Sequence, residues 1–134
     1  MNLHQAKNQS DLLADLIASV GDSGVLTREA LAERVCSFWD PSPLNARALV
    51  RPRSTRQLSE VMALCHAADQ PVVTHGGLTG CVQGALAGTD EVIISLERMT
   101  AIEEIDAVGR TLTGQAGALL QTVQQAVAEQ SLYF

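Results

Sequence analysis

The stretch of residues 72–85, VVTHGGLTGCVQGA, decides how the rest of this chain is interpreted. A short run of β-branched residues leads there into a turn, and five of the chain's ten glycines lie between positions 76 and 88. Between Gln70 and Thr89, His75 is the one side chain that can carry a formal charge. Glycine lets a ligand approach the backbone closely and supplies the positive φ angles that such a turn needs. Because a strand that ends in successive unhindered N–H groups binds anions, the stretch predicts a pyrophosphate site and hence a bound dinucleotide.

The glycine loop does not match the better-known phosphate loops. It has no G-x-G-x-x-G pattern that opens a helix and no G-K-[ST] sequence, so neither a Rossmann site nor a nucleoside-triphosphate site fits. A tight structural crossover is the alternative to a ligand site, because small residues also let backbone segments pack closely. Composition alone favours neither of the two.

A strand, a helix and a second strand are predicted to precede the loop. Residues 48–52, ALVRP, indicate a short strand that a proline ends, and Ser54 and Gln57 have the spacing of a capping box. The helix that follows, at about 55–69, has a core-facing stripe made of Leu58, Val61, Met62, Cys65 and Ala68. A proline ends this helix, and residues 72–74 form the next strand. This βαβ unit places the glycine loop at the end of its second strand.

Further elements are predicted after the loop. Residues 91–96, EVIISL, indicate a buried strand. Two strands at about 102–106 and 110–115 are expected to pair around a turn near Gly109, with a bulge or an edge irregularity. A final helix is predicted over 118–130, with one apolar side made of Leu119, Leu120, Val123 and Val127.

Two helices are predicted before the first strand. One covers residues 11–20 and ends at a left-handed Gly21, and a shorter one begins at Thr27, whose hydroxyl is expected to cap it. Two prolines then interrupt regular structure. We expect Phe38 and Trp39 to anchor this segment against the body, with stacking on a ligand as the alternative.

These elements predict the fold class and the division of the chain. The fold is expected to be α+β, with helices that flank a small, mostly parallel sheet and an antiparallel pair after it. We expect an N-terminal helical prelude over residues 1–45 and the main body over residues 46–134.

Composition excludes several classes of partner. The net charge of −6 argues against nucleic acid and anionic membrane surfaces, because both bind clustered positive charge. Three widely spaced cysteines, Cys36, Cys65 and Cys81, indicate neither a disulfide framework nor a zinc site. The first residues lack the apolar run of a signal peptide and no segment is apolar enough to span a membrane, so a cytoplasmic location is expected.

The longer series of segments resembles a known family. The segments LVRPRSTRQLSEVMALC, PVVTHGGLTGCVQGA, EVIISLERMTAIEEID and TLTGQAGALLQTVQQAVAEQ follow one another within residues 46–134. They are similar to the N-terminal part of the FAD-binding domain of the FAD-linked oxidases, the vanillyl-alcohol-oxidase type of flavin fold. The most specific pieces are the G-G-x-T-G core, the run V-x-x-x-L-x-x-M-x-x-I that begins at Val92, and Gly117. Within the family, the resemblance is to the branch of D-2-hydroxyglutarate, D-lactate and glycolate dehydrogenases.

The resemblance implies a cofactor site made of backbone. It implies that FAD is bound non-covalently and that its pyrophosphate is held by the loop amides, with further contacts nearby. The residues concerned are Gly76, Gly77, Leu78, Thr79, Gly80, Gly84 and Ala85. Uncharged donors can satisfy a diphosphate where the surrounding protein is acidic. No residue is assigned a catalytic role, and no metal site is indicated.

The chain departs from the family pattern around the loop. The family usually has proline and then arginine or glutamine where this chain has Thr74 and His75, and asparagine or glycine where it has Leu78. Leucine still provides its N–H, but it makes no side-chain hydrogen bond and adds bulk near the phosphates. We therefore expect weaker affinity. His75 is offset from the position at which some relatives attach the flavin covalently.

The family's flavin-closing and substrate-binding segments lie beyond the part that this sequence resembles. The resemblance therefore implies the pyrophosphate-binding N-terminal portion of a flavin-dependent 2-hydroxy-acid dehydrogenase or oxidase, which does not catalyse alone. A C-terminal portion or another subunit would complete it. One alternative is a truncated or degenerate copy that dimerises and acts as a protein-interaction module without flavin. Another is that the loop binds a different phosphate-bearing ligand.

Overall fold

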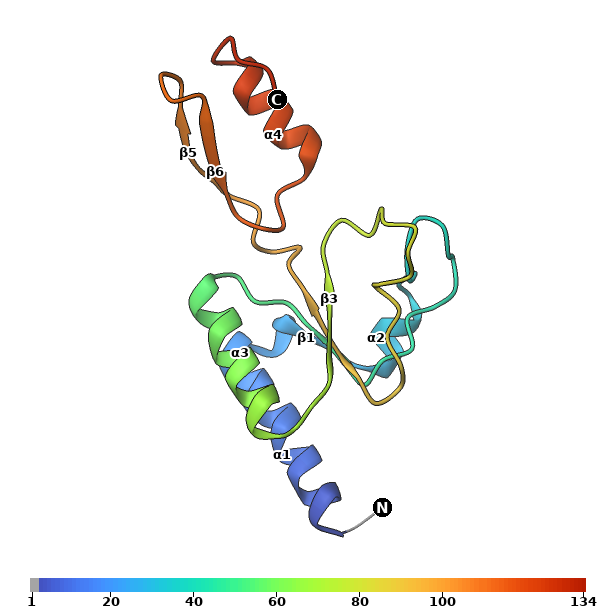
Figure 1. Cartoon of the computed structure of the whole chain (residues 1–134). Helices are drawn as coiled ribbons and strands as arrows, with labels where there is room; N and C mark the ends of the chain where they lie inside the picture. The colour runs from blue at the N-terminus through green and yellow to red at the C-terminus, as the bar shows by residue number, and fades with distance from the viewer. Residues whose placement is uncertain (1–2) are drawn as a thin grey trace.

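The computed structural model describes the backbone of residues 3–134 and the side chains of residues 11–27 and 29–134. Figure 1 shows one part built around a sheet and a second part near the C-terminus. The elements are α1 (Leu3–Val20), the 3-10 turn η1 (Asp22–Gly24), β1 (Val25–Leu26), α2 (Arg28–Ala32), β2 (Ala48–Val50), α3 (Thr55–Ala67), β3 (Val72–His75), β4 (Val92–Ser95), β5 (Ile102–Asp106), β6 (Thr111–Gly114) and α4 (Leu120–Ala128).

Four strands form the main sheet in the order β1-β2-β4-β3. β2 and β3 both run parallel to β4. Ile93 of β4 lies opposite Leu49 of β2 on one side and opposite Val73 of β3 on the other. β1 adds an antiparallel edge beside β2. The predicted mostly parallel sheet is confirmed, and so is the βαβ unit with α3 as its crossover. Because parallel strands end at the same edge of a sheet, β2, β3 and β4 share one carboxyl edge.

The main sheet has a buried core on each face, because successive strand residues point to opposite sides. On one face the strand residues pack with α1 and α3, and this core contains Leu12, Leu16, Val20, Val25, Ala48, Val50, Val61, Cys65, Val92 and Ile94. On the other face the core contains Leu31, Cys36, Leu44, Ala46, Leu49 and Ile93. Complete burial of one leucine or isoleucine side chain contributes about 1.5–3 kcal/mol. The cores on both faces therefore stabilise the main sheet, from which the loop after β3 extends.

The ends of α1 and α3 follow the predicted signals. Gly21 has a φ of 80° and donates its N–H to the carbonyl of Ile17 at 2.8 Å, which ends α1. The Ser54 hydroxyl accepts a hydrogen bond from the N–H of Gln57 at 3.2 Å, which caps α3. The side chain of Gln57 reaches back one residue further than a capping box requires, to the N–H of Arg53 at 2.8 Å.

Two local predictions were wrong, and one strand was not predicted. The short helix α2 begins after Thr27, as expected, but the Thr27 side chain makes no capping hydrogen bond. Residues 25–26 form β1, a strand too short to show any periodicity in the sequence. Met62 is largely exposed rather than core-facing, because the sheet is narrow and α3 buries only Val61 and Cys65 completely.

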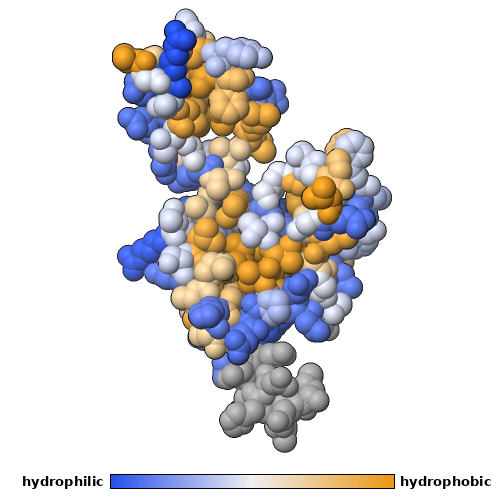
Figure 2. Space-filling model, in the orientation of Figure 1, coloured by the Kyte–Doolittle hydropathy of each residue, from blue (hydrophilic) through white to orange (hydrophobic). Residues whose placement is uncertain are grey.

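β5 and β6 form a separate two-stranded antiparallel sheet, as predicted. The register shifts between Ile102 and Glu104, where an irregularity was expected. Val123 of α4 is buried, but Leu120 and the N-cap residue Leu119 are 59% and 63% exposed, so the predicted apolar side is only partly covered. Figure 2 shows hydrophobic surface over this C-terminal part of the chain.

Candidate functional site

The glycine loop begins at the carboxyl edge of the main sheet. β3 leads directly into Gly76, while Arg51 and Glu97 follow β2 and β4 closely at the same edge. In Figure 1 the loop after β3 lies beside the segment that joins α2 to β2. In open α/β sheets, ligands bind outside the carboxyl ends of the strands. The predicted binding stretch is therefore at the edge where a ligand is expected.

Packing within the protein does not require glycine at four of the loop positions. A Cβ atom added at Gly76, Gly77, Gly80 or Gly84 would meet no other atom within 4 Å. By contrast, a Cβ added at Gly117 would lie 1.8 Å from the carbonyl oxygen of Leu96, so packing requires glycine there. The loop glycines therefore keep open a space that the protein itself does not fill.

Positive φ angles in the loop fall on residues other than glycine, contrary to the prediction. Leu78 has a φ of 57° and Gln83 has a φ of 59°, whereas none of the loop glycines adopts a positive φ. The left-handed region is unfavourable for a leucine because its Cβ approaches the backbone. The sign of φ thus changes between Gly77 and Leu78. An anion-binding nest also places a left-handed residue beside one of the opposite hand, so the loop has one feature of such a nest.

The loop amides are free to donate to a ligand. Within the described residues, no backbone N–H from position 76 to position 85 donates to another protein atom. Several carbonyl groups of these residues accept hydrogen bonds instead: Leu78 accepts from the N–H of Phe38 at 3.2 Å, Thr79 from Nε1 of Trp39 at 3.3 Å, and Gln83 from the N–H of Leu86 at 3.1 Å. The donors that a diphosphate needs are therefore not consumed by the fold.

His75 ties the two ends of the loop together. Its side chain is only 2% exposed, and its Nε2 lies 2.8 Å from the carbonyl oxygen of Ala85. A carbonyl only accepts, so Nε2 carries the proton. Burial, which disfavours the charged imidazolium, lowers the pKa of His75, and the hydrogen bond to Ala85 offsets this only in part. His75 is thus a neutral, buried link between the two ends of the loop.

A charged cluster that the sequence did not reveal lies at the same edge. The carboxylate of Glu97 accepts hydrogen bonds from Nη1 of Arg34 and Nη1 of Arg51, each at 3.1 Å, and from the hydroxyl of Ser95, also at 3.1 Å. Burial alone would raise the pKa of Glu97, but the bonds from both arginines hold it below its usual value. Two guanidinium groups against one carboxylate leave a net positive charge near the loop. The one signal in the sequence is an acidic residue placed just after a buried strand.

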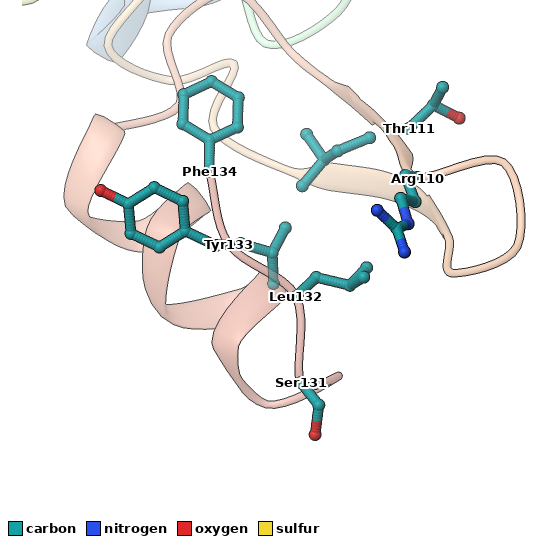
Figure 3. Close-up of a pocket in the computed structure, with 8 residues that line it drawn as sticks. Arg110, Thr111, Ser131, Leu132, Tyr133 and Phe134 are labelled. Carbon is teal, nitrogen blue, oxygen red and sulfur yellow. The ribbon is translucent and has the colours of Figure 1, made fainter.

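A cavity of about 340 Å³ lies elsewhere, between the hairpin β5–β6 and the C-terminal tail. Its lining includes Leu112, Val127, Leu132 and Phe134, and Figure 3 shows the tail on one side of it and Arg110 on the hairpin on the other. None of the predicted site residues lines this cavity. Among the described residues, no group of histidine, cysteine or acidic side chains could hold a metal ion. No helix within the described residues is long and apolar enough to cross a membrane.

Comparison with known families now settles the family. Residues 46–134 match the family model described as an FAD binding domain. The chain belongs to this FAD-binding family. The match begins just before β2 and includes the whole glycine loop. FAD is therefore the cofactor of this family member, as the resemblance implied.

Several relatives of this FAD-binding chain are named as enzymes of hydroxy acids. A D-2-hydroxyglutarate dehydrogenase of Xanthomonas citri pv. viticola is 40% identical over 96 residues, which cover 72% of this chain and 20% of that protein. The glycolate oxidase subunit GlcD of Escherichia coli K12 is 36% identical over 86 residues, which cover 64% of this chain and 17% of that protein. The FAD-binding chain thus spans about a fifth of the length of such relatives.

Solved structures confirm the flavin fold. An alkyldihydroxyacetonephosphate synthase matches with a TM-score of 0.78 and 16% identity, over 90% of this chain and 27% of that chain. A substrate-bound p-cresol methylhydroxylase matches with a TM-score of 0.71 and 18% identity, over 94% of this chain and 25% of that chain. At such identities the likeness concerns the fold, which is the predicted vanillyl-alcohol-oxidase type.

The geometry of the loop fits the diphosphate of FAD. Open space at the glycines, unused amides and the His75 link together form a preorganised, uncharged donor site. The nearby arginines add positive charge in a protein that is acidic overall. A bound flavin would supply the redox chemistry, and this chain's residues would hold and orient it.

Proposed function

We propose that the loop amides of residues 76–80, with Gly84 and Ala85, bind the pyrophosphate of FAD without a covalent bond. The observation that carries this proposal is the contrast between glycines. Gly117 has no side chain because its neighbours leave no room, whereas Gly76, Gly77 and Gly80 face open space. The fold does not require glycine at these loop positions, and a ligand that occupies the open space would explain why glycine is present there.

The electrostatics support the same proposal. A protein with a net charge of −6 repels a dianionic ligand at long range, so local donors must outweigh that repulsion. Hydrogen bonds to a charged partner contribute about 1.5–3 kcal/mol each, and several adjacent amides are available. The arginine pair around Glu97 reduces the remaining repulsion at this edge. In this proposal the backbone amides provide most of the binding, and the arginine pair assists them.

We further propose that the chain is the pyrophosphate-binding portion of a flavin-dependent 2-hydroxy-acid dehydrogenase or oxidase. The names of the relatives support this class of substrate. In this proposal residues 46–134 are the first part of the FAD-binding domain, and residues 1–45 precede it. Substrate chemistry would be completed by polypeptide that corresponds to the rest of the relatives' length. A cytoplasmic location is part of the same proposal.

Calorimetric titration with FAD tests the binding site. Gly77→Val should abolish FAD binding and leave the fold intact, because its branched side chain enters the open space in front of the amides. Gly88→Val is the matched control from the same loop: its Cβ makes only an ordinary contact, 3.5 Å from Glu91, and it lies outside the proposed contacts. Retained FAD binding in Gly77→Val would show that the loop is merely structural.

A second function has one specific observation in its favour. Leu119, Leu120, Tyr133 and Phe134 are exposed in the C-terminal part, where Figure 2 shows hydrophobic surface. Such a surface is typical of an interaction module, closed by a second copy or by another subunit. Sedimentation analysis separates the two functions. A protein that ignores added FAD but dimerises supports the module, whereas a flavin-binding protein supports the cofactor site.

A further inference from the structure

We propose that the segment 35–44, which precedes the residues matched by the family model, is a positioning element for the cofactor loop. It sets the direction of the loop amides through the N–H of Phe38 and the indole of Trp39. This inference rests on the proposed function and adds to it residues that lie outside the family match. Figure 1 shows the segment, between α2 and β2, beside the loop after β3.

Both ends of the segment are fixed to the main sheet. Cys36 and Leu44 are buried and pack in the core that contains Ile93. Val35 and Pro43 face each other in a β-bridge. The N–H of Cys36 also donates to the carbonyl of Ser42 at 3.0 Å, and that of Leu44 donates to the carbonyl of Arg34 at 2.8 Å. The segment is therefore a closed loop with a rigid base.

The tip of the segment is held by its own hydrogen bonds. The Ser37 hydroxyl accepts from the N–H groups of Trp39 and Asp40, at 3.2 and 3.1 Å. The carboxylate of Asp40 accepts from the N–H of Ser42 at 2.9 Å, and its hydrogen bonds with Ser42 lower the pKa of Asp40. The tip thus keeps its shape without packing into the core.

The exposure of the aromatic pair needs an explanation. Phe38 is 78% exposed and Trp39 is 64% exposed, so the expectation that they anchor the segment by packing was wrong. Their rings pack edge to face, with the ring centroids 5.0 Å apart. What connects these two residues to the body is hydrogen bonding to the loop, at the carbonyls of Leu78 and Thr79.

Those two bonds determine where the loop amides point. In a trans peptide unit the C=O and the following N–H point in opposite directions, and no described peptide bond is cis. Because the carbonyl of Leu78 points to the segment, the N–H of Thr79 points away from it. In the same way, the bond to Trp39 turns the N–H of Gly80 away. Two successive donors are therefore presented on the side of the loop opposite the segment.

The same bonds help to hold an unfavourable backbone. Leu78, with its positive φ, carries the carbonyl that Phe38 binds. A leucine leaves the left-handed region unless its surroundings fix it there. The segment thus preserves the change in φ that brings the neighbouring amides together. Without it, the loop would lose the arrangement that a diphosphate requires.

The test compares Trp39→Phe with Phe38→Leu. Trp39→Phe keeps an aromatic ring but removes the indole donor, so affinity for FAD and for ADP should fall about threefold to tenfold. Phe38→Leu keeps the backbone N–H that donates to Leu78, so its affinity should match the wild type. Riboflavin and adenosine, which lack the diphosphate, should show no such difference. The melting temperature without ligand should be unchanged in Phe38→Leu and only slightly lower in Trp39→Phe, because both rings are exposed and a single hydrogen bond is lost.

Fluorescence gives a second readout, since Trp39 is the only tryptophan of the chain. ADP should change its emission in the wild type and adenosine should not. Equal losses of affinity in both variants would indicate ring contact with the ligand and would overturn the inference, as would wild-type affinity in both. Absence of FAD binding by the wild type would refute the proposed function and this inference with it.

Discussion

Replacement of Leu78 tests whether the loop has the backbone described. The left-handed conformation costs an ordinary L-residue about 1–2 kcal/mol, whereas asparagine adopts it readily. Leu78→Asn and Leu78→Ala both remove the partly buried leucine side chain, but only asparagine relieves the strain at φ 57°. We therefore expect the asparagine variant to be more stable than the alanine variant by about 1 kcal/mol.

Thermal and urea unfolding measure this difference. About 1 kcal/mol corresponds to a difference of about 2–8 °C in melting temperature for a domain of this size. Leu86, in the same loop but without a positive φ, gives the matched control: Leu86→Asn should have no advantage over Leu86→Ala. The asparagine variant at 78 should also bind FAD at least as tightly as the wild type, because the loop is better preorganised. Equal stability of the two variants at position 78 would refute a left-handed backbone there.

Four other changes test the packing and the charges. Gly117→Ala should prevent folding or cost several kcal/mol, since its Cβ would clash with a carbonyl oxygen at 1.8 Å, which circular dichroism and denaturation will show. Gly80→Ala, which meets open space, should leave the melting temperature of the ligand-free protein unchanged or slightly higher, and a large decrease would contradict the open loop. Because the folded pKa of His75 is below its unfolded value of 6.5, stability should be complete above that pH and decline as the pH falls through 6.5 toward the folded pKa. A profile of melting temperature against pH that is the same in His75→Asn would rule this out. Glu97→Gln should cost about 1–2 kcal/mol in urea unfolding, because the partly exposed arginines lose their shared carboxylate; an unchanged midpoint would show that the cluster contributes nothing.

The sequence predicted the elements whose signals are local. The cap at Ser54, the apolar run of β4 and the turn before β6 all depend on neighbouring residues, and each was found where it was expected. β1 was missed because two residues carry no period, and it exists only through pairing with β2. The exposure of Leu119 was missed because an apolar stripe does not say whether anything covers it.

The loop after β3 was predicted in position, but its backbone conformation was not. Glycine density and the absence of charge located the loop, yet the residues with positive φ turned out to be Leu78 and Gln83. The roles of His75 and Glu97 depend on partners distant in the sequence, such as Ala85 and Arg34. No spacing rule in a single sequence reveals such pairs, because the fold brings them together.

Amide NMR with FAD tests most directly whether the free amides after β3 receive a diphosphate. In a 1H–15N spectrum of the labelled protein, the signals of Gly77, Thr79 and Gly80 should move furthest on addition of FAD, downfield as expected for new hydrogen bonds to phosphate oxygens. ADP should move the same signals. If they stay in place while signals around the cavity at Phe134 move, the loop is not the cofactor site.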